Sequence, residues 1–290
     1  MSSRLALGTV QFGAPYGIAN QIGQVSRSEA AAILDYAVTA GLDTLDTASA
    51  YGESEQRLGE IGVEQWQIIT KLPAVPEFCT DVHAWVQSSV LGSLERLRTP
   101  KLYGLLLHCG QQLFGPHGND LYRALVAIKD EGKVEKVGVS IYAPSELEAL
   151  WPNHQFDLVQ APFNVMDRRL ATSGWLAWLH EAGIEIHVRS VFLQGLLLMN
   201  PSSRPSTFNR WQPLWQEWDR WLSEQALSPL QACLGFVLAH PEIDRVVVGV
   251  DSLMQLKGII ANAQMPTVEM PGTLVSEDID LINPSRWVTL

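Results

Sequence analysis

Short apolar runs alternate with longer amphipathic stretches along almost the whole chain. The runs are nearly continuous in apolar residues, which is typical of parallel strands covered by helices. Eight such runs are expected to be strands: "RLALGTV" from Arg4, "LDTLDT" from Leu42, "WQIITKL" from Trp66, "LYGLLLH" from Leu102, "VEKVGVS" from Val134, "FDLVQ" from Phe156, "IEIHVRS" from Ile184 and "RVVVGV" from Arg245.

The stretches between these runs carry the apolar spacing and the end signals of helices. Ser28 is the expected N-cap of "SEAAAILDYAVTAG", and Gly41 is the expected stop. Further helices are predicted from Glu53, over 81–97 before Pro100, over 119–131 and over 252–262.

Eight strand–helix units in 290 residues predict an α/β protein with a single closed (β/α)8 barrel, the TIM barrel, over residues 1–290. The alternative is an open doubly wound sheet. Because no GxGxxG follows the first strand, we expect no Rossmann domain.

The longest departure from the alternation is the segment 198–228. Four tryptophans recur there at helical spacing: Trp211, Trp215, Trp218 and Trp221. We expect a helix packed on the barrel, with a lid lining the substrate site as the alternative. Near the C-terminus, Trp287 is likewise expected to pack on the barrel rather than reach a pocket.

Composition narrows the functional classes. Hydrophobic residues make up 47% and charged residues 18%, and the net charge is −11. The acidic balance argues against nonspecific nucleic-acid binding, which requires lysine and arginine. No apolar run is long enough for a membrane span, no signal peptide is visible, and the three cysteines form no CxxC pair, so a cytoplasmic protein with reduced thiols is expected.

Polar residues end six consecutive strands. Taken singly, each has a structural explanation as a cap, a loop tie or a core residue. In a barrel, however, the carboxyl ends of the strands form the active-site face, so together they predict a site. These residues are Asp46, Lys71, His108, Ser140, Gln160 and Arg189.

The chemistry of this rim is proton transfer to a carbonyl. Asp46 would keep a buried Lys71 charged, and the cation would stabilise the phenolate form of Tyr51. At roughly 4 Å and an effective dielectric of about 20, one charge contributes about 4 kcal/mol. His108 could orient the carbonyl. No nucleophile–base pair and no cluster of metal ligands is visible, so no metal is predicted.

Carbonyl reduction also needs a hydride source. Ser140 and Gln160 are the residue types that bind a carboxamide, which nicotinamide carries. The stretch "GVDSLMQL" opens the helix after the last strand, and this place in a barrel often binds phosphate.

The chain resembles the aldo-keto reductases over nearly its whole length. The motifs "LGTVQFG", "DTASAYGESEQRLG", "ITKL", "LLLH", "KVEKVGVS", "VQAPFNVMDR" and "RSVFLQGLL" occur in the order typical of that family. The resemblance implies an NAD(P)H-dependent oxidoreductase that interconverts an aldehyde or ketone, such as a sugar or another small carbonyl compound, and the alcohol. It implies a catalytic tetrad of Asp46, Tyr51, Lys71 and His108, with Tyr51 as general acid and base.

The resemblance also implies a set of cofactor-binding residues: Thr9, Val10, Asp46, Ser140, Gln160, Arg189, Ser190, Phe192, Gly195, Gly249, Asp251 and Gln255. Ile141 and Arg189 replace the asparagine and the aromatic residue of many members. At the positions that often hold a 2′-phosphate, Gly249 and Gln255 stand where lysine and arginine are common, with Asp251 between them. The cofactor is therefore NADP(H) or NAD(H), with the usual preference for NADPH weakened.

Two other functions stay open. Lys71 could form a Schiff base, as in an aldolase. Alternatively, the chain could be a non-catalytic relative that binds the cofactor and acts as a subunit or partner.

Overall fold

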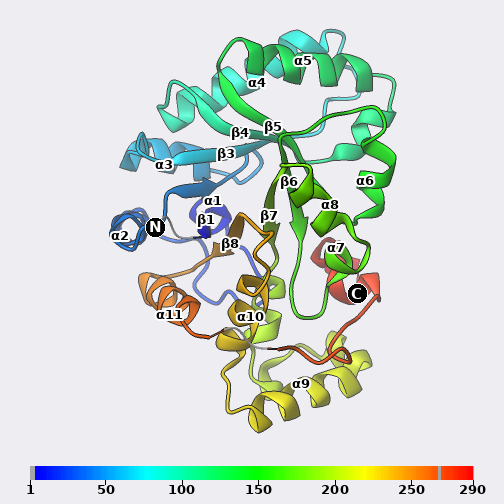
Figure 1. Cartoon of the computed structure of the whole chain (residues 1–290). Helices are drawn as coiled ribbons and strands as arrows, with labels where there is room; N and C mark the ends of the chain where they lie inside the picture. Colours follow the sequence, from blue (N-terminus) through cyan, green and yellow to red (C-terminus); the bar gives the residue numbers. More distant parts are fainter. Residues whose placement is uncertain (1–3, 267–268, 290) are drawn as a thin grey trace.

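The computed structural model describes residues 4–266 and 269–289, and its centre is a closed barrel of eight parallel strands (Figure 1). The strands pair in chain order, and the last pairs with the first. They are β1 (Leu5–Gly8), β2 (Thr44–Asp46), β3 (Gln67–Leu72), β4 (Leu102–Leu107), β5 (Val134–Ser140), β6 (Leu158–Pro162), β7 (Glu185–Arg189) and β8 (Arg245–Gly249). The predicted (β/α)8 barrel is confirmed, while the predicted domain limits, residues 1 and 290, lie outside the described residues.

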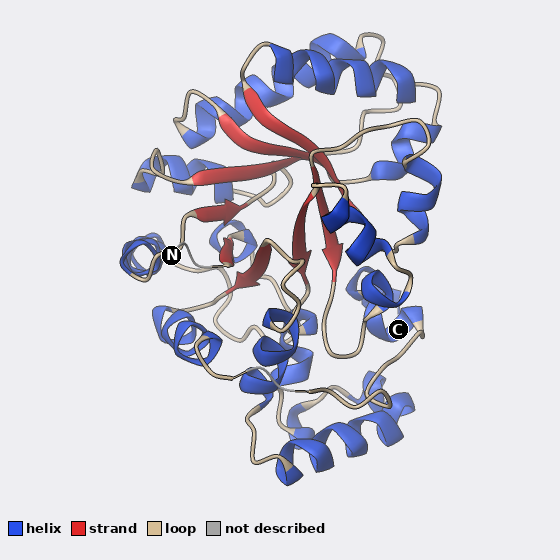
Figure 2. Cartoon of the chain, in the orientation of Figure 1, coloured by secondary structure: helices blue, strands red, loops and turns tan. Residues whose placement is uncertain are grey.

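The helices surround the strands (Figure 2). The α-helices are α1 (Val10–Gly13), α2 (Arg27–Thr39), α3 (Ser54–Ile61), α4 (Val82–Leu97), α5 (Gly118–Asp130), α6 (Ser145–Leu150), α7 (Arg169–Thr172), α8 (Trp175–Glu181), α9 (Gln212–Glu224), α10 (Pro229–Leu238), α11 (Leu253–Ala263) and α12 (Ile279–Ile282). The 3-10 helices are η1 (Gly110–Phe114), η2 (Leu193–Leu198), η3 (Pro201–Ser203), η4 (Ser206–Trp211) and η5 (Pro284–Thr289).

The predicted helices α4, α5 and α11 begin and end within one residue of their predicted bounds, and α3 begins within one residue of its predicted start, but one predicted helix cap is wrong. The predicted N-cap Ser28 is wrong, because Ser28 lies inside the first turn of α2. Ser26 is the cap, and its hydroxyl accepts a hydrogen bond from the backbone N–H of Glu29 at 3.2 Å. Gly41 follows the end of α2 with φ +82°, a left-handed conformation that suits glycine. The predicted strand "FDLVQ" also continues beyond its expected end, to Pro162.

The interior of the barrel is filled by side chains. Ile69, Leu106 and Leu158 form an apolar cluster there, and all three are fully buried. Gly104 leaves room for it, since a Cβ at this position would lie 3.0 Å from Ile69 and 3.3 Å from Leu158. The glycine within "LYGLLL" is therefore a packing requirement of the barrel core.

A polar cluster closes the amino-terminal end of the barrel. Glu185 accepts hydrogen bonds from the Tyr103 hydroxyl at 2.7 Å and from Lys136, and its other oxygen lies 2.6 Å from His187 Nε2. Because β4 and β7 are not neighbours, the bond from Tyr103 crosses the interior. Burial opposes ionisation, but the bonds from His187 and Lys136 outweigh it and lower the pKa of Glu185 to about 2.

The tryptophan-rich segment after β7 forms α9, on the side of the barrel away from α4 and α5 (Figure 1). Trp215, Trp218 and Trp221 are buried in the main apolar core and do not line the pocket described below. The tryptophans therefore pack on the barrel, while Leu198 and Met199, at the start of the segment, do line the pocket. Trp287 also packs, with its ring centroid 4.9 Å from that of Phe208.

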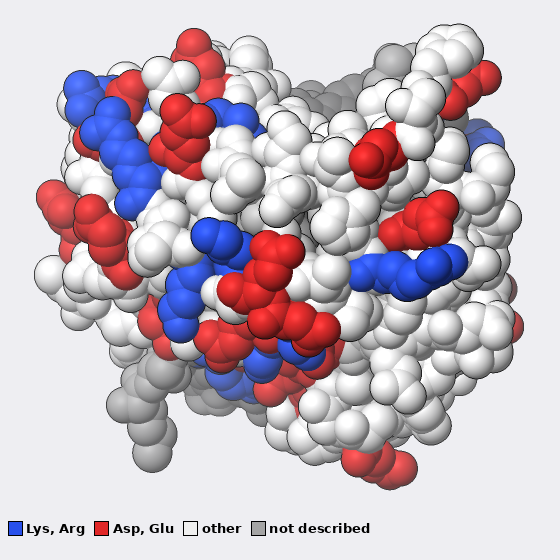
Figure 3. Space-filling view, turned by 90° about the horizontal axis from the view of Figure 1, so that it is seen from above, with Lys and Arg blue, Asp and Glu red and all other residues white. Residues whose placement is uncertain are grey.

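The surface charge and the cysteines point to no particular binding partner. On the face shown in Figure 3, acidic and basic side chains form mixed groups instead of a continuous basic area. Within 4–266 and 269–289, no helix has the length and apolar character needed to cross a membrane. Cys79, Cys109 and Cys233 form no disulfide.

Candidate active site

A cavity of about 680 Å³ opens at the carboxyl ends of the strands. Its volume lies in the range of small-molecule sites. Every residue predicted for the site lines it: Thr9, Val10, Asp46, Tyr51, Lys71, His108, Ser140, Gln160, Arg189, Ser190, Phe192, Gly195, Gly249, Asp251 and Gln255. The fold therefore brings together residues that are spread over most of the chain.

A buried ion pair lies at the centre of this pocket. Lys71 Nζ donates to both carboxylate oxygens of Asp46, at 2.7 and 2.8 Å, and to the carbonyl oxygen of Thr47 at 2.9 Å. Lys71 is 1% exposed and Asp46 is 4% exposed. Burial alone would lower the pKa of Lys71, but the Asp46 carboxylate outweighs it and raises that pKa. Lys71 is thus held as a fixed cation.

Tyr51 lies directly beside this cation. Its hydroxyl is 3.5 Å from Lys71 Nζ, and its ring centroid is 5.1 Å from the same atom. The loop that carries Tyr51 packs against Gly13 of α1, where a Cβ would lie only 1.7 Å from the Tyr51 carbonyl oxygen. The position of the tyrosine therefore depends on a glycine contact as well as on β2.

A chain of buried hydroxyl groups holds the end of β2. The Thr9 hydroxyl donates to the carbonyl oxygen of Asp46 at 3.0 Å, and the Ser54 hydroxyl lies 2.9 Å from the Thr9 carbonyl and 3.1 Å from the Thr47 hydroxyl. The Thr9 side chain is fully buried, and its hydroxyl fixes the backbone at Asp46.

His108 follows β4 and meets Tyr51 edge to face. The ring centroids are 6.0 Å apart, with 82° between the planes. Burial, together with the positive charges of Lys71 and Arg189, lowers the pKa of His108 to about 4. His108 is therefore neutral near pH 7 and can donate one N–H to a substrate oxygen.

The two residues predicted to bind a carboxamide are linked to the ion pair. Gln160 Nε2 donates to Asp46 Oδ2 at 2.7 Å, and the Ser140 hydroxyl donates to Gln160 Oε1 at 3.3 Å. Gln160 is fully buried and Ser140 is 2% exposed. A ligand that binds these two side chains would therefore also contact the hydrogen-bond network around Asp46.

Arg189 lies over an aromatic ring. Its guanidinium carbon is 4.7 Å from the centroid of the Tyr142 ring, and its NH2 group donates to the carbonyl oxygen of Ile141 at 2.9 Å. The Ile141 side chain is fully buried and does not line the pocket. The sequence did not reveal Tyr142 as a member of the pocket.

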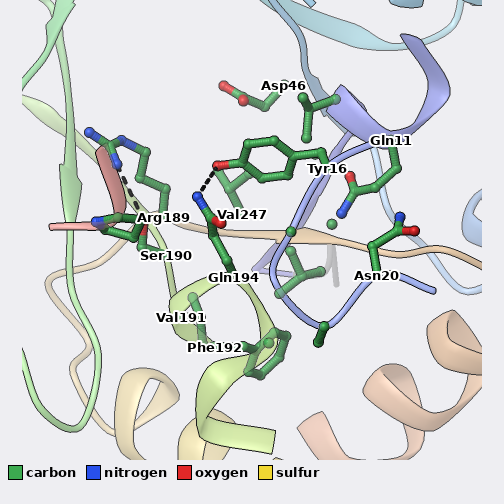
Figure 4. A pocket seen from close by; sticks show the side chains of 18 of the residues that line it. Gln11, Tyr16, Asn20, Asp46, Arg189, Ser190, Val191, Phe192, Gln194 and Val247 are labelled. Atoms are coloured by element: carbon green, nitrogen blue, oxygen red, sulfur yellow. Dashed lines mark hydrogen bonds between the residues drawn. The ribbon is translucent and has the colours of Figure 1, made fainter. Parts of the chain in front are cut away.

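The loops after β1 and β7 meet across the pocket (Figure 4). Gln194 Nε2 donates to the Tyr16 hydroxyl at 3.2 Å, and the backbone N–H of Ala19 lies 3.4 Å from the Gln194 carbonyl oxygen. Ser190, Leu193 and Gln194 have φ values of 60°, 45° and 52°, which are unfavourable for residues other than glycine. Such strain is common where a backbone is shaped around a ligand.

Several polar residues of the β1 loop were missed by sequence reasoning. Besides Tyr16, they are Gln11 and Asn20, which both line the pocket. Gln11 is 9% exposed, and its Oε1 is buried without a hydrogen-bond partner among the described residues. Its amide lies against Gly249, where a Cβ would be 2.5 Å from Gln11 Nε2. The only sequence feature that could have indicated Gln11 as a pocket residue is its place inside the motif "LGTVQFG".

The far end of the pocket is formed by α11 and the loop before it. Asp251 Oδ1 accepts a hydrogen bond from Asn20 Nδ2 at 2.9 Å. The backbone N–H of Leu253, in the first turn of α11, donates to Glu29 Oε1 of α2 at 2.7 Å. The predicted anion site at this helix start is thus already in contact with a carboxylate of the chain itself.

A parallel barrel with a lysine–carboxylate pair, a tyrosine and a neutral histidine at its carboxyl end has the groups of an enzyme that transfers a proton to or from a bound small molecule. The sequence profile of the Aldo/keto reductase family matches residues 4–271. The chain therefore belongs to the aldo/keto reductase family, and it is an NAD(P)-dependent oxidoreductase that interconverts carbonyl compounds and alcohols.

Individual relatives are distant but cover most of the chain. The chain is 26% identical to an uncharacterized oxidoreductase, YqkF, of Bacillus subtilis (strain 168), over 84% of this chain and 85% of the relative. It is also 26% identical to a D-threo-aldose 1-dehydrogenase of a Pseudomonas species, over 94% and 93% of the two chains. The solved structure of the aldo-keto reductase AKR11C1 from Bacillus halodurans has the same fold, with a TM-score of 0.74, 21% identity and coverage of 92% of this chain and 89% of that one.

Proposed function

We propose that Tyr51 is the general acid in carbonyl reduction by this enzyme, and the general base in the reverse reaction. The observation that carries the proposal is the buried, ion-paired Lys71 Nζ, which lies 3.5 Å from the Tyr51 hydroxyl. A fixed cation at this distance favours the phenolate that forms when the proton leaves.

His108 is the second group that contacts the substrate oxygen in this proposal. It is neutral, so it can donate a hydrogen bond without competing with Tyr51 as a strong acid. A carbonyl oxygen held by both groups would be oriented for protonation.

The pocket fits a nicotinamide dinucleotide. When bound, the reduced cofactor would supply a hydride to the carbonyl carbon. Ser140 and Gln160 would hold the carboxamide, and Arg189 would contact the nicotinamide ring with its planar guanidinium. Gln11 Oε1 is buried without a described partner and could accept a hydrogen bond from a donor on the ligand, and the absence of a side chain at Gly249 gives the Gln11 amide its room.

The Schiff-base alternative is disfavoured by the state of Lys71. An amine nucleophile must lose its proton, whereas the Asp46 carboxylate raises the pKa of Lys71. Nζ is also held by three carboxylate and carbonyl oxygens.

The proposed substrates are small carbonyl compounds, such as a sugar or another aldehyde, and the relative named as an aldose dehydrogenase supports that class. Tyr16 and Tyr142 are 43% and 37% exposed and would offer aromatic faces to such a molecule at the mouth of the pocket. The three unpaired cysteines support a location in the reducing cytoplasm, which is also part of the proposal.

The test is the Tyr51→Phe variant, assayed with a panel of aldehydes and ketones and with cofactor binding measured separately. Turnover should fall by at least about a thousandfold, while cofactor affinity stays within a few-fold. Tyr122→Phe is the matched control, because its hydroxyl bonds to the Gln155 carbonyl on the surface. Near-normal turnover of Tyr51→Phe would remove Tyr51 as the acid.

A further inference from the structure

The reacting groups lie at one end of the pocket, and this determines where each half of a bound dinucleotide must lie. This inference rests on the proposed function, which puts the nicotinamide beside Tyr51 and Lys71. The adenosine half must then lie at the opposite end, which is lined by Leu230, Asp251, Gln255, Gly258 and Ile259.

Among the described residues that line the pocket, none at the adenosine end is a lysine or arginine. Within that described lining, the lysines and arginines are Lys71 and Arg189. Both lie at the reacting end: Lys71 Nζ is 3.5 Å from the Tyr51 hydroxyl, and Arg189, at the end of β7, lies over the Tyr142 ring and donates to the Ile141 carbonyl oxygen. A 2′-phosphate on the adenosine ribose would therefore meet no lysine or arginine of the lining. Phosphate sites normally use such side chains or free N–H groups at a helix start.

The N–H groups at the start of α11 are largely used by the chain itself. Leu253 N donates to Glu29 Oε1 at 2.7 Å, Gln255 N donates to the Ser252 hydroxyl at 3.3 Å, and Asp251 N donates to Gln255 Oε1 at 2.8 Å. Glu29 also lies in the first turn of α2. The Glu29 carboxylate is thus stabilised by the positive ends of two helix dipoles and occupies the place where an anion would bind.

Asp251 adds a second negative charge at this end, and its orientation is fixed. Asn20 Nδ2 donates to Oδ1 at 2.9 Å, and Gln255 Nε2 donates to Oδ2 at 3.4 Å. A carboxylate accepts hydrogen bonds from ribose hydroxyls, and in other dinucleotide folds this contact is associated with NAD rather than NADP. The same group repels a phosphate, which carries a charge of about −1.5 to −2.

We propose that this enzyme selects NAD(H) over NADP(H), and that Glu29 and Asp251 are the residues responsible. Asp251 accepts the ribose hydroxyls, while Glu29 blocks the helix start and repels a phosphate there. Each carboxylate accounts for about a tenfold change in the ratio of the two dissociation constants, or about 1.4 kcal/mol.

The experiment is a titration of the purified protein with NADH and, separately, NADPH, followed by quenching of tryptophan fluorescence. NADH should bind at least about tenfold more tightly. In Glu29→Gln and Asp251→Asn, which remove the charge and keep one acceptor oxygen each, the ratio should move toward NADPH by about tenfold each. Glu224→Gln removes the same charge from an exposed side chain of α9 and should leave the ratio unchanged.

The results that would contradict the selectivity, the roles of the two carboxylates and the proposed function differ from one another. Equal or tighter binding of NADPH by the unmodified protein would overturn the selectivity but leave the proposed function intact. An unchanged ratio in both variants, with melting temperatures within a few degrees of the unmodified protein, would overturn the roles of Glu29 and Asp251. Binding of neither cofactor would instead contradict the proposed function itself.

Discussion

Replacement of Lys71 by methionine separates the catalytic and structural effects of one buried charge. The variant removes the cation that lies 2.7 Å from Asp46 and 3.5 Å from the Tyr51 hydroxyl, while methionine keeps most of the side-chain volume. Catalysis depends on the contact between Lys71 and Tyr51, whereas stability depends on the contact between Lys71 and Asp46. The loss of turnover and the loss of stability can therefore be estimated separately.

The loss of turnover follows from the contact with Tyr51. At 3.5 Å and an effective dielectric of about 20, a unit charge stabilises a neighbouring phenolate by about 5 kcal/mol. Each 1.4 kcal/mol or so corresponds to a factor of ten in rate. Lys71→Met should therefore lower turnover by about three orders of magnitude.

The loss of stability follows from the contact with Asp46. The carboxylate is 4% exposed, and without Lys71 it is a buried charge with no cation beside it. Removal of one partner of a buried pair lowers the free energy of unfolding by about 3–5 kcal/mol. The double variant Asp46→Asn/Lys71→Met removes both charges, so it should recover much of this stability but none of the turnover.

The assays are urea denaturation and steady-state carbonyl reduction, with cofactor affinity as a check. Lys129→Met is the matched control, since its partner Asp157 is a third exposed and the pair should contribute about 1 kcal/mol or less. Recovery of turnover in the double variant, or a single variant within tenfold of normal turnover, would refute the electrostatic role of Lys71.

Three further predictions concern the surroundings of the site and the opposite end of the barrel. The pKa of Glu185 is about 2 against an ordinary 4.5, so its ionisation stabilises the fold above about pH 4.5 and this contribution is lost as the pH falls toward 2. Urea denaturation at several pH values should therefore show that the free energy of unfolding falls by up to about 3 kcal/mol less in Glu185→Gln than in the unmodified protein over that interval. Parallel plots of this free energy against pH for the two proteins would contradict the prediction. Gly13→Ala places a Cβ 1.7 Å from the Tyr51 carbonyl, so turnover should drop at least about tenfold in a kinetic assay; unchanged kinetics would show that the loop adjusts freely. Gln160→Leu removes the 2.7 Å bond to Asp46 and should raise the cofactor dissociation constant and lower kcat by about tenfold each, whereas normal values of both would exclude the proposed link.

The strands and the rim of the site could be predicted because both depend on local sequence. A run such as "QIITKL" indicates a buried strand, and a barrel brings its polar end, Lys71, to the same face as Asp46 and His108. The N-cap of α2 was predicted wrongly at Ser28, because both Ser26 and Ser28 are of a type that caps helices and only the side-chain geometry shows that Ser26 does so.

The missing parts of the site depend on contacts between distant segments. Asn20 reaches Asp251 across 231 positions, and Glu29 reaches Leu253 across 224. Neither residue stands at the end of a strand, and neither has a pattern that predicts a polar partner. Only the closure of β8 against β1 brings these loops together.

The most direct test of the account is deuterium transfer from a reduced nicotinamide labelled on the carbon that carries the hydride. The protein is incubated with this cofactor and the best aldehyde from the panel, and the alcohol is analysed by mass spectrometry. The account predicts one deuterium on the former carbonyl carbon, and Tyr51→Phe should lower the rate without changing where the label goes. An alcohol formed without the label, or capture of the aldehyde on Lys71 by borohydride, would contradict it.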